Sequence, residues 1–212
     1  TGAIRDSLFT LQTGPRGRFW LLFPGPDPIL TIRGSEDFLM PNGAYVFDPE
    51  EYRLTFLEKN PADPSQPLGM AISLYEDPDR NLWLGAYPGF YQIRFSQNDG
   101  QFRPRFRNYD LSGGDLTVKD EARDAWEASP GHLWLAMESG LKRLTLPTGD
   151  RLAFRHDATD ESSIGGTRVI ALFADEANDK LWIGHENGLD WVSLAEARKE
   201  RPALRFRHVD DR

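Results

Sequence analysis

The sequence contains no cysteine. This absence excludes disulfide bonds, cysteine-ligated zinc and thiol nucleophiles. No apolar run approaches the roughly 18 residues of a membrane-spanning helix. The first residues, Thr-Gly-Ala-Ile-Arg, lack the apolar core of a secretory signal. Because the chain does not begin with Met, we expect a segment of a longer protein, with any membrane attachment in flanking segments.

An excess of positive charge is also lacking. The chain has 33 acidic and 25 basic residues and a net charge of −8, which disfavours a nucleic-acid partner. Helical periodicity is nearly absent outside residues 194–200, where we expect a loop or a single helical turn. The 19 glycines, 15 prolines and 12% aromatic residues instead favour many short strands joined by tight turns.

Three segments of the chain are nearly the same. Each has a tryptophan flanked by aliphatic residues, and each is followed by a glycine and an apolar residue. Trp83, Trp134 and Trp182 are 51 and 48 residues apart. A fixed period near fifty is typical of repeat architectures. The segments are residues 81–85, 132–136 and 180–184, with the following pairs at 89–90, 140–141 and 188–189.

Each repeat contains four short strand patterns separated by turn residues, which predicts a β-propeller blade. We therefore expect an all-β fold with four blades, at about 1–66, 67–118, 119–164 and 165–212. The first blade is a weaker copy, with strands at 7–10, 18–21, 42–46 and 54–56 and an insertion at 24–40. Its Phe9 falls in the column of Tyr75, Trp126 and Phe173.

The pattern of an apolar strand, an Asp-containing turn, Leu-Trp-aliphatic-Gly, Gly-Leu and Phe-Arg-x-x-Asp resembles the two-component regulator propeller repeat. The segments 157–164 and 60–65 resemble the acidic linker of that family. This sequence departs from the pattern at Ala136, where glycine is usual, and at Ala128, near the expected turn Asp.

The resemblance implies a seven-bladed ring of which four blades are present here. It also implies the periplasmic or extracellular part of an inner-membrane regulator, such as a hybrid histidine kinase. Such a domain senses an oligosaccharide and signals through a homodimer. An output kinase or cyclase belongs to the rest of such a protein.

The sequence contains no catalytic constellation. It has neither an HExxH nor a GxSxG motif, and we expect no enzyme activity, metal or cofactor in this segment. Residues 77–81 have some oxygen ligands of a calcium loop, but a turn with Asx hydrogen bonds explains them equally well. His156 and His208 fall at equivalent outer-strand positions, which favours a repeat feature, whereas His185 falls where a propeller displays side chains.

Function in a repeat protein is expected where the repeat is broken. Arg123 stands at a position where two other repeats have Ile72 and Ile170, and we align Arg5 with the same position. Together with neighbouring turn residues, these arginines form a predicted rim site for a hydroxyl-rich or acidic ligand. Alternatively, they pair with nearby acids and only solvate the channel. The rim candidates are Arg5, Tyr87, Arg123, Asp124, Glu138, Arg168, His185, Glu186 and Asn187.

Three functional interpretations follow. The first is a non-enzymatic sensory propeller that binds a carbohydrate or similar polar ligand. The second is a stand-alone propeller that binds proteins. The third is a propeller lyase or hydrolase, for which only His185 is a candidate at the channel mouth. Fold alone cannot choose among them.

Overall fold

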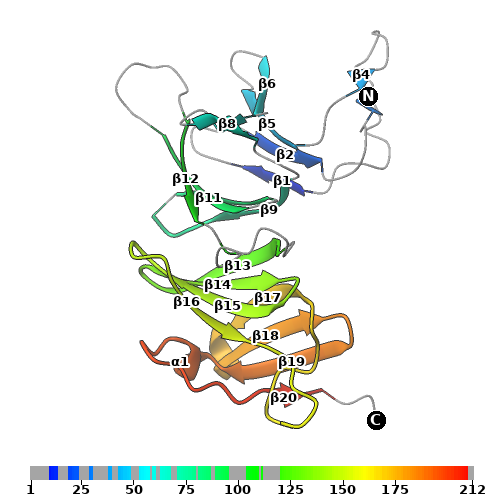
Figure 1. The fold of residues 1–212 in the computed structure, drawn as a ribbon, viewed down its shortest axis with the longest axis vertical. Helices are drawn as coiled ribbons and strands as arrows, with labels where there is room; N and C mark the ends of the chain where they lie inside the picture. The colour runs from blue at the N-terminus through cyan, green and yellow to red at the C-terminus, as the bar shows by residue number, and fades with distance from the viewer. Residues whose placement is uncertain are drawn as a thin grey trace. The chain divides into compact units, whose positions relative to one another are not determined.

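The computed structural model folds as two compact units, residues 1–118 and 119–212. The first contains two four-stranded antiparallel sheets, with orders β1-β2-β5-β6 and β12-β11-β10-β9 (Figure 1). The structure describes residues 10–13, 19–23, 29–30, 38–39, 43–48, 53–57, 59–60, 63–67, 71–79, 81–86, 89–95, 104–109, 111 and 120–209.

The strands of the first unit follow the predicted repeats. The first sheet contains β1 (Thr10–Thr13), β2 (Phe19–Phe23), β5 (Gly43–Asp48) and β6 (Arg53–Leu57). Two short hairpins follow sheet strands, β3 (Ile29–Leu30) with β4 (Phe38–Leu39) and β7 (Lys59–Asn60) with β8 (Asp63–Pro67). The second sheet contains β9 (Ala71–Glu76), β10 (Leu82–Ala86), β11 (Gly89–Phe95) and β12 (Pro104–Tyr109).

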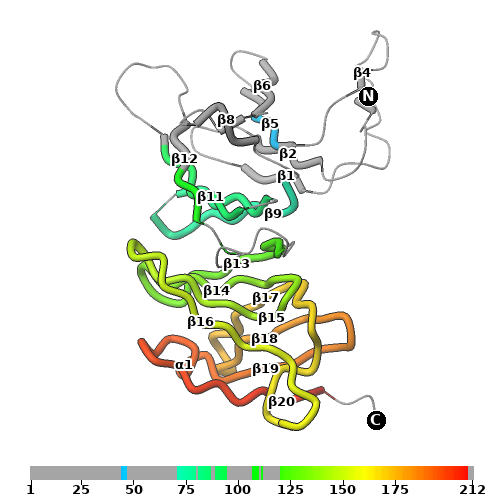
Figure 2. Tube along the Cα trace, in the orientation of Figure 1, coloured from blue at the N-terminus to red at the C-terminus, as the bar shows by residue number. Residues whose placement is uncertain are grey.

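The second unit contains the third and fourth sheets. The third consists of β13 (Ala122–Ser129), β14 (His132–Met137), β15 (Gly140–Thr145) and β16 (Asp150–Phe154). The fourth consists of β17 (Val169–Asp175), β18 (Lys180–His185), β19 (Gly188–Ser193) and β20 (Arg207–His208), with a 3-10 turn at Glu176–Asn178 and helix α1 at Leu194–Ala197. Figure 2 shows the connection 155–168 passing beside β20, where Phe206 N–H donates to the Ser162 carbonyl.

These four antiparallel sheets confirm the all-β propeller architecture and the single helical turn after Ser193. The expected insertion at 24–40 contains β3 and β4, and the predicted linker 60–65 takes part in the β7–β8 hairpin. The first strand, however, lies later in the chain than the predicted 7–10, at Thr10–Thr13. Gln12, and not Phe9, lies opposite Trp20, because the connection 14–18 has the same length as 77–81 and β1 therefore ends at Thr13.

The tryptophan strands form the cores of the sheets. Trp83 and Trp134 are fully buried, and Tyr75, Trp126 and Phe173 lie opposite Trp83, Trp134 and Trp182, which confirms that column. In the second unit, Trp134, Leu141 and Ala136 of the third sheet pack against aliphatic residues of the fourth. Truncating a buried aromatic side chain of this kind costs about 3–5 kcal/mol.

Asp77 fixes the turn before the tryptophan strand of the second sheet. Its Oδ1 accepts the Asn81 N–H at 2.7 Å, and its Oδ2 accepts the Trp83 indole N–H at 2.9 Å and the Asn81 amide at 2.8 Å. These bonds match the interpretation of residues 77–81 as a turn held by aspartate hydrogen bonds, although they reach the backbone four residues on and not two. Ala128 occupies the same position in the third sheet, where the carboxylate is missing.

Candidate functional site

The turn between the second and third strands is tied to the segment that enters the first strand. In the third sheet, Asp120 accepts hydrogen bonds from the Ser139 backbone N–H at 3.1 Å and from its hydroxyl at 2.7 Å, and it pairs with Lys142. In the fourth sheet the direction is reversed, because Glu186 in the turn accepts from Thr167 and Arg168 in the entering segment. In both sheets, therefore, the turn between the second and third strands is hydrogen-bonded to the segment that enters the first strand, but by different residues. We call this side of the sheets the edge.

The Glu186 carboxylate is held by three donors. One oxygen accepts the Thr167 backbone N–H at 2.9 Å and the Thr167 hydroxyl at 2.7 Å, and the other accepts the Arg168 N–H at 2.9 Å. Burial opposes ionisation, but these hydrogen bonds outweigh it and lower the pKa of Glu186 to about 2. Glu186 is thus an anion at neutral pH that orders the start of β17.

Arg123 and Arg168 meet at one carboxylate. Glu138 lies 2.9 Å from Arg123 Nε and 3.8 Å from Arg168 Nη1, and Glu121 lies 3.9 Å from Arg123 Nη2. Two arginines and two glutamates balance in charge, as the ion-pairing alternative predicts. Arg168 remains almost half exposed. Its guanidinium retains planar N–H donors suited to hydroxyl or carboxylate oxygens.

Asp124 points away from this network. Its carboxylate accepts the Ala125 N–H at 2.8 Å and, from the fourth sheet, the Leu172 N–H at 2.8 Å. Burial raises the pKa of Asp124, and these two backbone hydrogen bonds oppose the rise. Asp124 therefore joins neighbouring sheets.

His185 was predicted to be displayed, and this prediction is wrong. Its side chain is 4% exposed. The ring is covered by Gly166, where an added Cβ would lie 2.6 Å from His185 Nδ1. That nitrogen accepts the Asn187 N–H at 3.2 Å, while the exposed Asn187 amide donates to the Gly165 carbonyl.

His156 and His208 were predicted to be equivalent, and this is also wrong. His208 lies opposite Asp190 within the fourth sheet, whereas Ala153 holds the corresponding place opposite Lys142 in the third. His156 lies beyond the end of β16 and contacts the Ile164 carbonyl at 2.7 Å. The longer excursion through α1 shifts the outer strand, so that Val209 corresponds to Phe154 of the third sheet.

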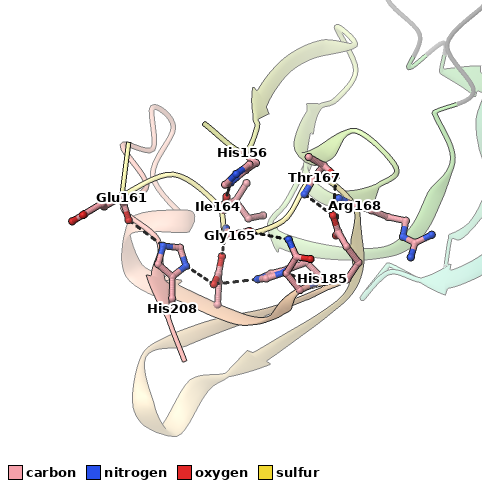
Figure 3. Close-up of polar contacts among 11 residues, drawn as sticks. His156, Glu161, Ile164, Gly165, Thr167, Arg168, His185 and His208 are labelled. Carbon is pink, nitrogen blue, oxygen red and sulfur yellow. Dashed lines mark hydrogen bonds and ion pairs between the residues drawn. The ribbon is translucent and has the colours of Figure 1, made fainter. Parts of the chain in front are cut away.

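Sequence reasoning did not single out Asp190. Its buried carboxylate lies 2.7 Å from His208 Nδ1 and 3.2 Å from His185 Nε2, and it accepts the Gly165 N–H at 2.7 Å (Figure 3). The available signals were the Gly165–Gly166 pair and the acid at a position occupied by Lys142 one repeat earlier. Beside this cluster, an open hollow of about 100 Å³ is lined in part by His156, Asp157, Glu161, Ile164 and His208.

The remaining rim candidates, Arg5 and Tyr87, lie outside the described residues. The alignment of Arg5 with Arg123 required Phe9 to face Trp20, and Gln12 faces it instead. Among the described residues, no group of three or more His, Asp or Glu side chains is arranged to hold a metal ion. In that same part of the chain, no helix combines the length and apolarity of a membrane crossing.

The fold is a β-propeller-type array of four-stranded sheets, and solved structures of other proteins have the same fold. The chain matches the extracellular domain of the hybrid two-component system BT3049 from B. thetaiotaomicron, with 18% identity and a TM-score of 0.58 over 88% of this chain and 28% of that one. No protein-family model and no curated protein sequence matches it.

Two further structures have the same fold. PorZ of Porphyromonas gingivalis, a surface component of the type-IX secretion system, gives 16% identity and a TM-score of 0.60, over 87% of this chain and 25% of PorZ. The periplasmic gluconolactonase PpgL of Pseudomonas aeruginosa gives 15% identity and a TM-score of 0.55, over 96% of this chain and 57% of PpgL. The chain thus spans about a quarter of the length of the first two structures.

Proposed function

We propose that this chain is the sensory propeller segment of a bacterial membrane signalling regulator. It lies on the extracytoplasmic side and has no enzymatic role of its own. It binds a carbohydrate or similar polar ligand at the edge that carries Arg123, Glu138 and Arg168. The observation that carries this proposal is the meeting of these three charged side chains, drawn from two adjacent sheets, at one partly exposed edge.

The chemistry of this edge supports a polar ligand. Arg168 is anchored on one side by Glu138, and its backbone is anchored by Glu186. A guanidinium that is already oriented loses less freedom when it donates to a hydroxyl or carboxylate oxygen. The exposed Asn187 amide lies at the neighbouring turn and offers further polar atoms.

Similarity to the extracellular domain of a hybrid two-component system supports the sensory part of the proposal at the level of the fold. Because the chain spans 28% of that domain, the proposal includes further blades and an output domain in the same polypeptide, and signalling as a homodimer. These parts rest on the family resemblance of the repeat.

The test uses the full-length protein from its natural reading frame. An oligosaccharide collection is screened by calorimetry, and hits are retested with Arg168→Ala. Loss of one charge-assisted hydrogen bond predicts binding weaker by about tenfold or more. The matched control is Arg201→Ala, which removes an exposed arginine from the segment after α1.

Ligand binding that depends on Arg168 and leaves the oligosaccharide intact supports the proposal. Chemical turnover of a hit would instead establish a propeller enzyme. Absence of any saccharide binding, together with a cytosolic location of the full-length protein, would reject the sensory function.

A further inference from the structure

The fourth sheet carries a titratable cluster that breaks the repeat. His185 stands where β14 has Met137 and β10 has Ala86, and Asp190 stands where β15 has Lys142. The strands pair in the same way in each case, so only the side chains differ. Departures from a repeat are where a specific role is expected.

His208 faces two groups that only accept hydrogen bonds. Its Nδ1 lies 2.7 Å from Asp190 Oδ1, and its Nε2 lies 3.0 Å from the Glu161 carbonyl oxygen (Figure 3). A neutral imidazole carries one N–H and can donate to one of these partners, whereas the imidazolium donates to both. The folded geometry therefore favours the doubly protonated ring of His208.

Asp190 requires this positive charge. Its carboxylate is 1% exposed, and an unpaired buried charge is costly. The other ring near it is His185, whose Nδ1 accepts the Asn187 N–H, so the proton of the neutral ring lies on Nε2. That Nε2 lies 3.2 Å from Asp190 Oδ1 but is not directed for a hydrogen bond, which leaves His208 as the principal counter-charge.

Some of the surrounding charges favour a positive charge on His208, and others oppose it. Asp157, Asp160 and Glu161 of the connection line the hollow beside His208 and favour its positive charge. His156 lines the same hollow, and Arg205 and Arg207 precede His208 in the sequence, so these groups oppose that charge when ionised. Glu186 lies on the far side, near Gly166.

The cluster is joined directly to the rim. Gly165 and Gly166 lie against it so closely that a Cβ on Gly165 would be 3.0 Å from His208 Nδ1. Gly165 N–H donates to Asp190, and the next residues, Thr167 and Arg168, are held by Glu186. Any loosening of the connection at Gly165 is therefore transmitted within three residues to Arg168.

We propose that His208, Asp190 and His185 form a pH-sensitive clasp that fastens the connection 157–168 to the fourth sheet. The clasp is closed while His208 is an imidazolium. Its stabilisation is complete below the ordinary histidine range, around pH 6.5, and is lost as the pH rises and the Glu161 or Asp190 contact is given up. The clasp does not depend on what the rim binds.

The test is hydrogen exchange measured by mass spectrometry on the full-length protein, at about pH 5.5 and about pH 8, corrected for intrinsic exchange. We expect protection of peptides from 157–168 to fall by about tenfold at the higher pH, as for the loss of one charge-assisted hydrogen bond. Peptides from 132–145 should keep their protection. Equal protection of 157–168 at both pH values would overturn the proposal.

Variants separate the clasp from general effects of pH. His208→Gln should give low protection at both pH values, whereas His208→Arg, which donates at every pH, should remove the pH response. His156→Gln is the matched control, because His156 contacts the same connection through a single nitrogen on a single carbonyl and should keep the wild-type response. A pH response abolished by His156→Gln would reject His208 as the titrating group. If His208→Gln does not fold, the wild-type and His156→Gln pH series decide the question.

Discussion

The indole N–H of Trp134 donates to the backbone carbonyl of Ala197, 3.1 Å away and 63 residues later in the chain. In the second sheet the corresponding N–H of Trp83 donates to Asp77 in its own turn. The third sheet has Ala128 in place of this acid, and helix α1 of the next sheet supplies the missing acceptor. Arg143 reinforces the contact by donating to the Lys199 and Glu200 carbonyls.

Replacing Trp134 by Phe should destabilise the protein by about 1–3 kcal/mol, because the ring remains aromatic but the buried Ala197 carbonyl loses its donor. Trp182→Phe is the control. Because Trp182 is only partly buried, its replacement should lower the free energy of unfolding by less. Urea unfolding followed by fluorescence measures both. Equal losses for the two variants would contradict the proposed importance of the contact between sheets.

Asp77→Ala should cost about 2–4 kcal/mol, since it leaves the Asn81 N–H and the buried Trp83 indole N–H without their acceptor. Asp77→Asn retains one acceptor oxygen and should cost less. Thermal unfolding of the wild type with and without a chelator completes the test. A melting temperature that drops on chelation would restore the calcium interpretation of residues 77–81.

Glu186→Gln should destabilise the fourth sheet in a pH-dependent way. The folded pKa of Glu186 is about 2, below its ordinary value of 4.5, so its contribution is present above pH 4.5 and is lost as the pH falls towards 2. The stability difference between wild type and variant should therefore shrink in acid. Urea titrations at several pH values measure it, and a constant difference would show that the carboxylate charge is not responsible.

Isolated residues 1–212 should self-associate through the fourth sheet. Phe173 is 67% exposed and Val209 50%, whereas their counterparts Trp126 and Phe154 in the third sheet pack against the fourth. Phe173→Lys should reduce association in sedimentation velocity more than Leu152→Lys, a control at another exposed apolar site. A wild-type chain that sediments as a stable monomer would contradict this expectation.

The sequence period was sufficient to predict the sheets, because buried tryptophans and glycine turns recur at fixed spacing. It failed at the first strand, where no apolar residue matches Tyr75 and Gln12 takes its place opposite Trp20. Connection length, rather than hydrophobicity, sets the end of that strand. The register of a strand is set by the geometry of its connection as well as by its hydrophobic pattern, and the pattern of this strand alone did not fix it.

The candidate site was predicted only in part. Arg123, Glu138 and Arg168 do meet. Arg123 could be singled out because it stands where the other repeats have Ile72 and Ile170. Asp190 and His208 could not be paired from spacing, since the excursion through α1 shifts the outer strand relative to the preceding repeat. The burial of His185 depends on Gly166, whose missing side chain has no hydrophobic signature.

The dependence of Trp134 on Ala197 also limits how this chain could be recombined. A duplication or transplant of residues 119–164 alone would carry a tryptophan whose hydrogen-bond acceptor stays behind. Its neighbour Arg143 would lose both carbonyl partners in the same event. A transplanted third repeat should therefore be more stable when the fourth repeat accompanies it, although each looks like an independent copy in the sequence.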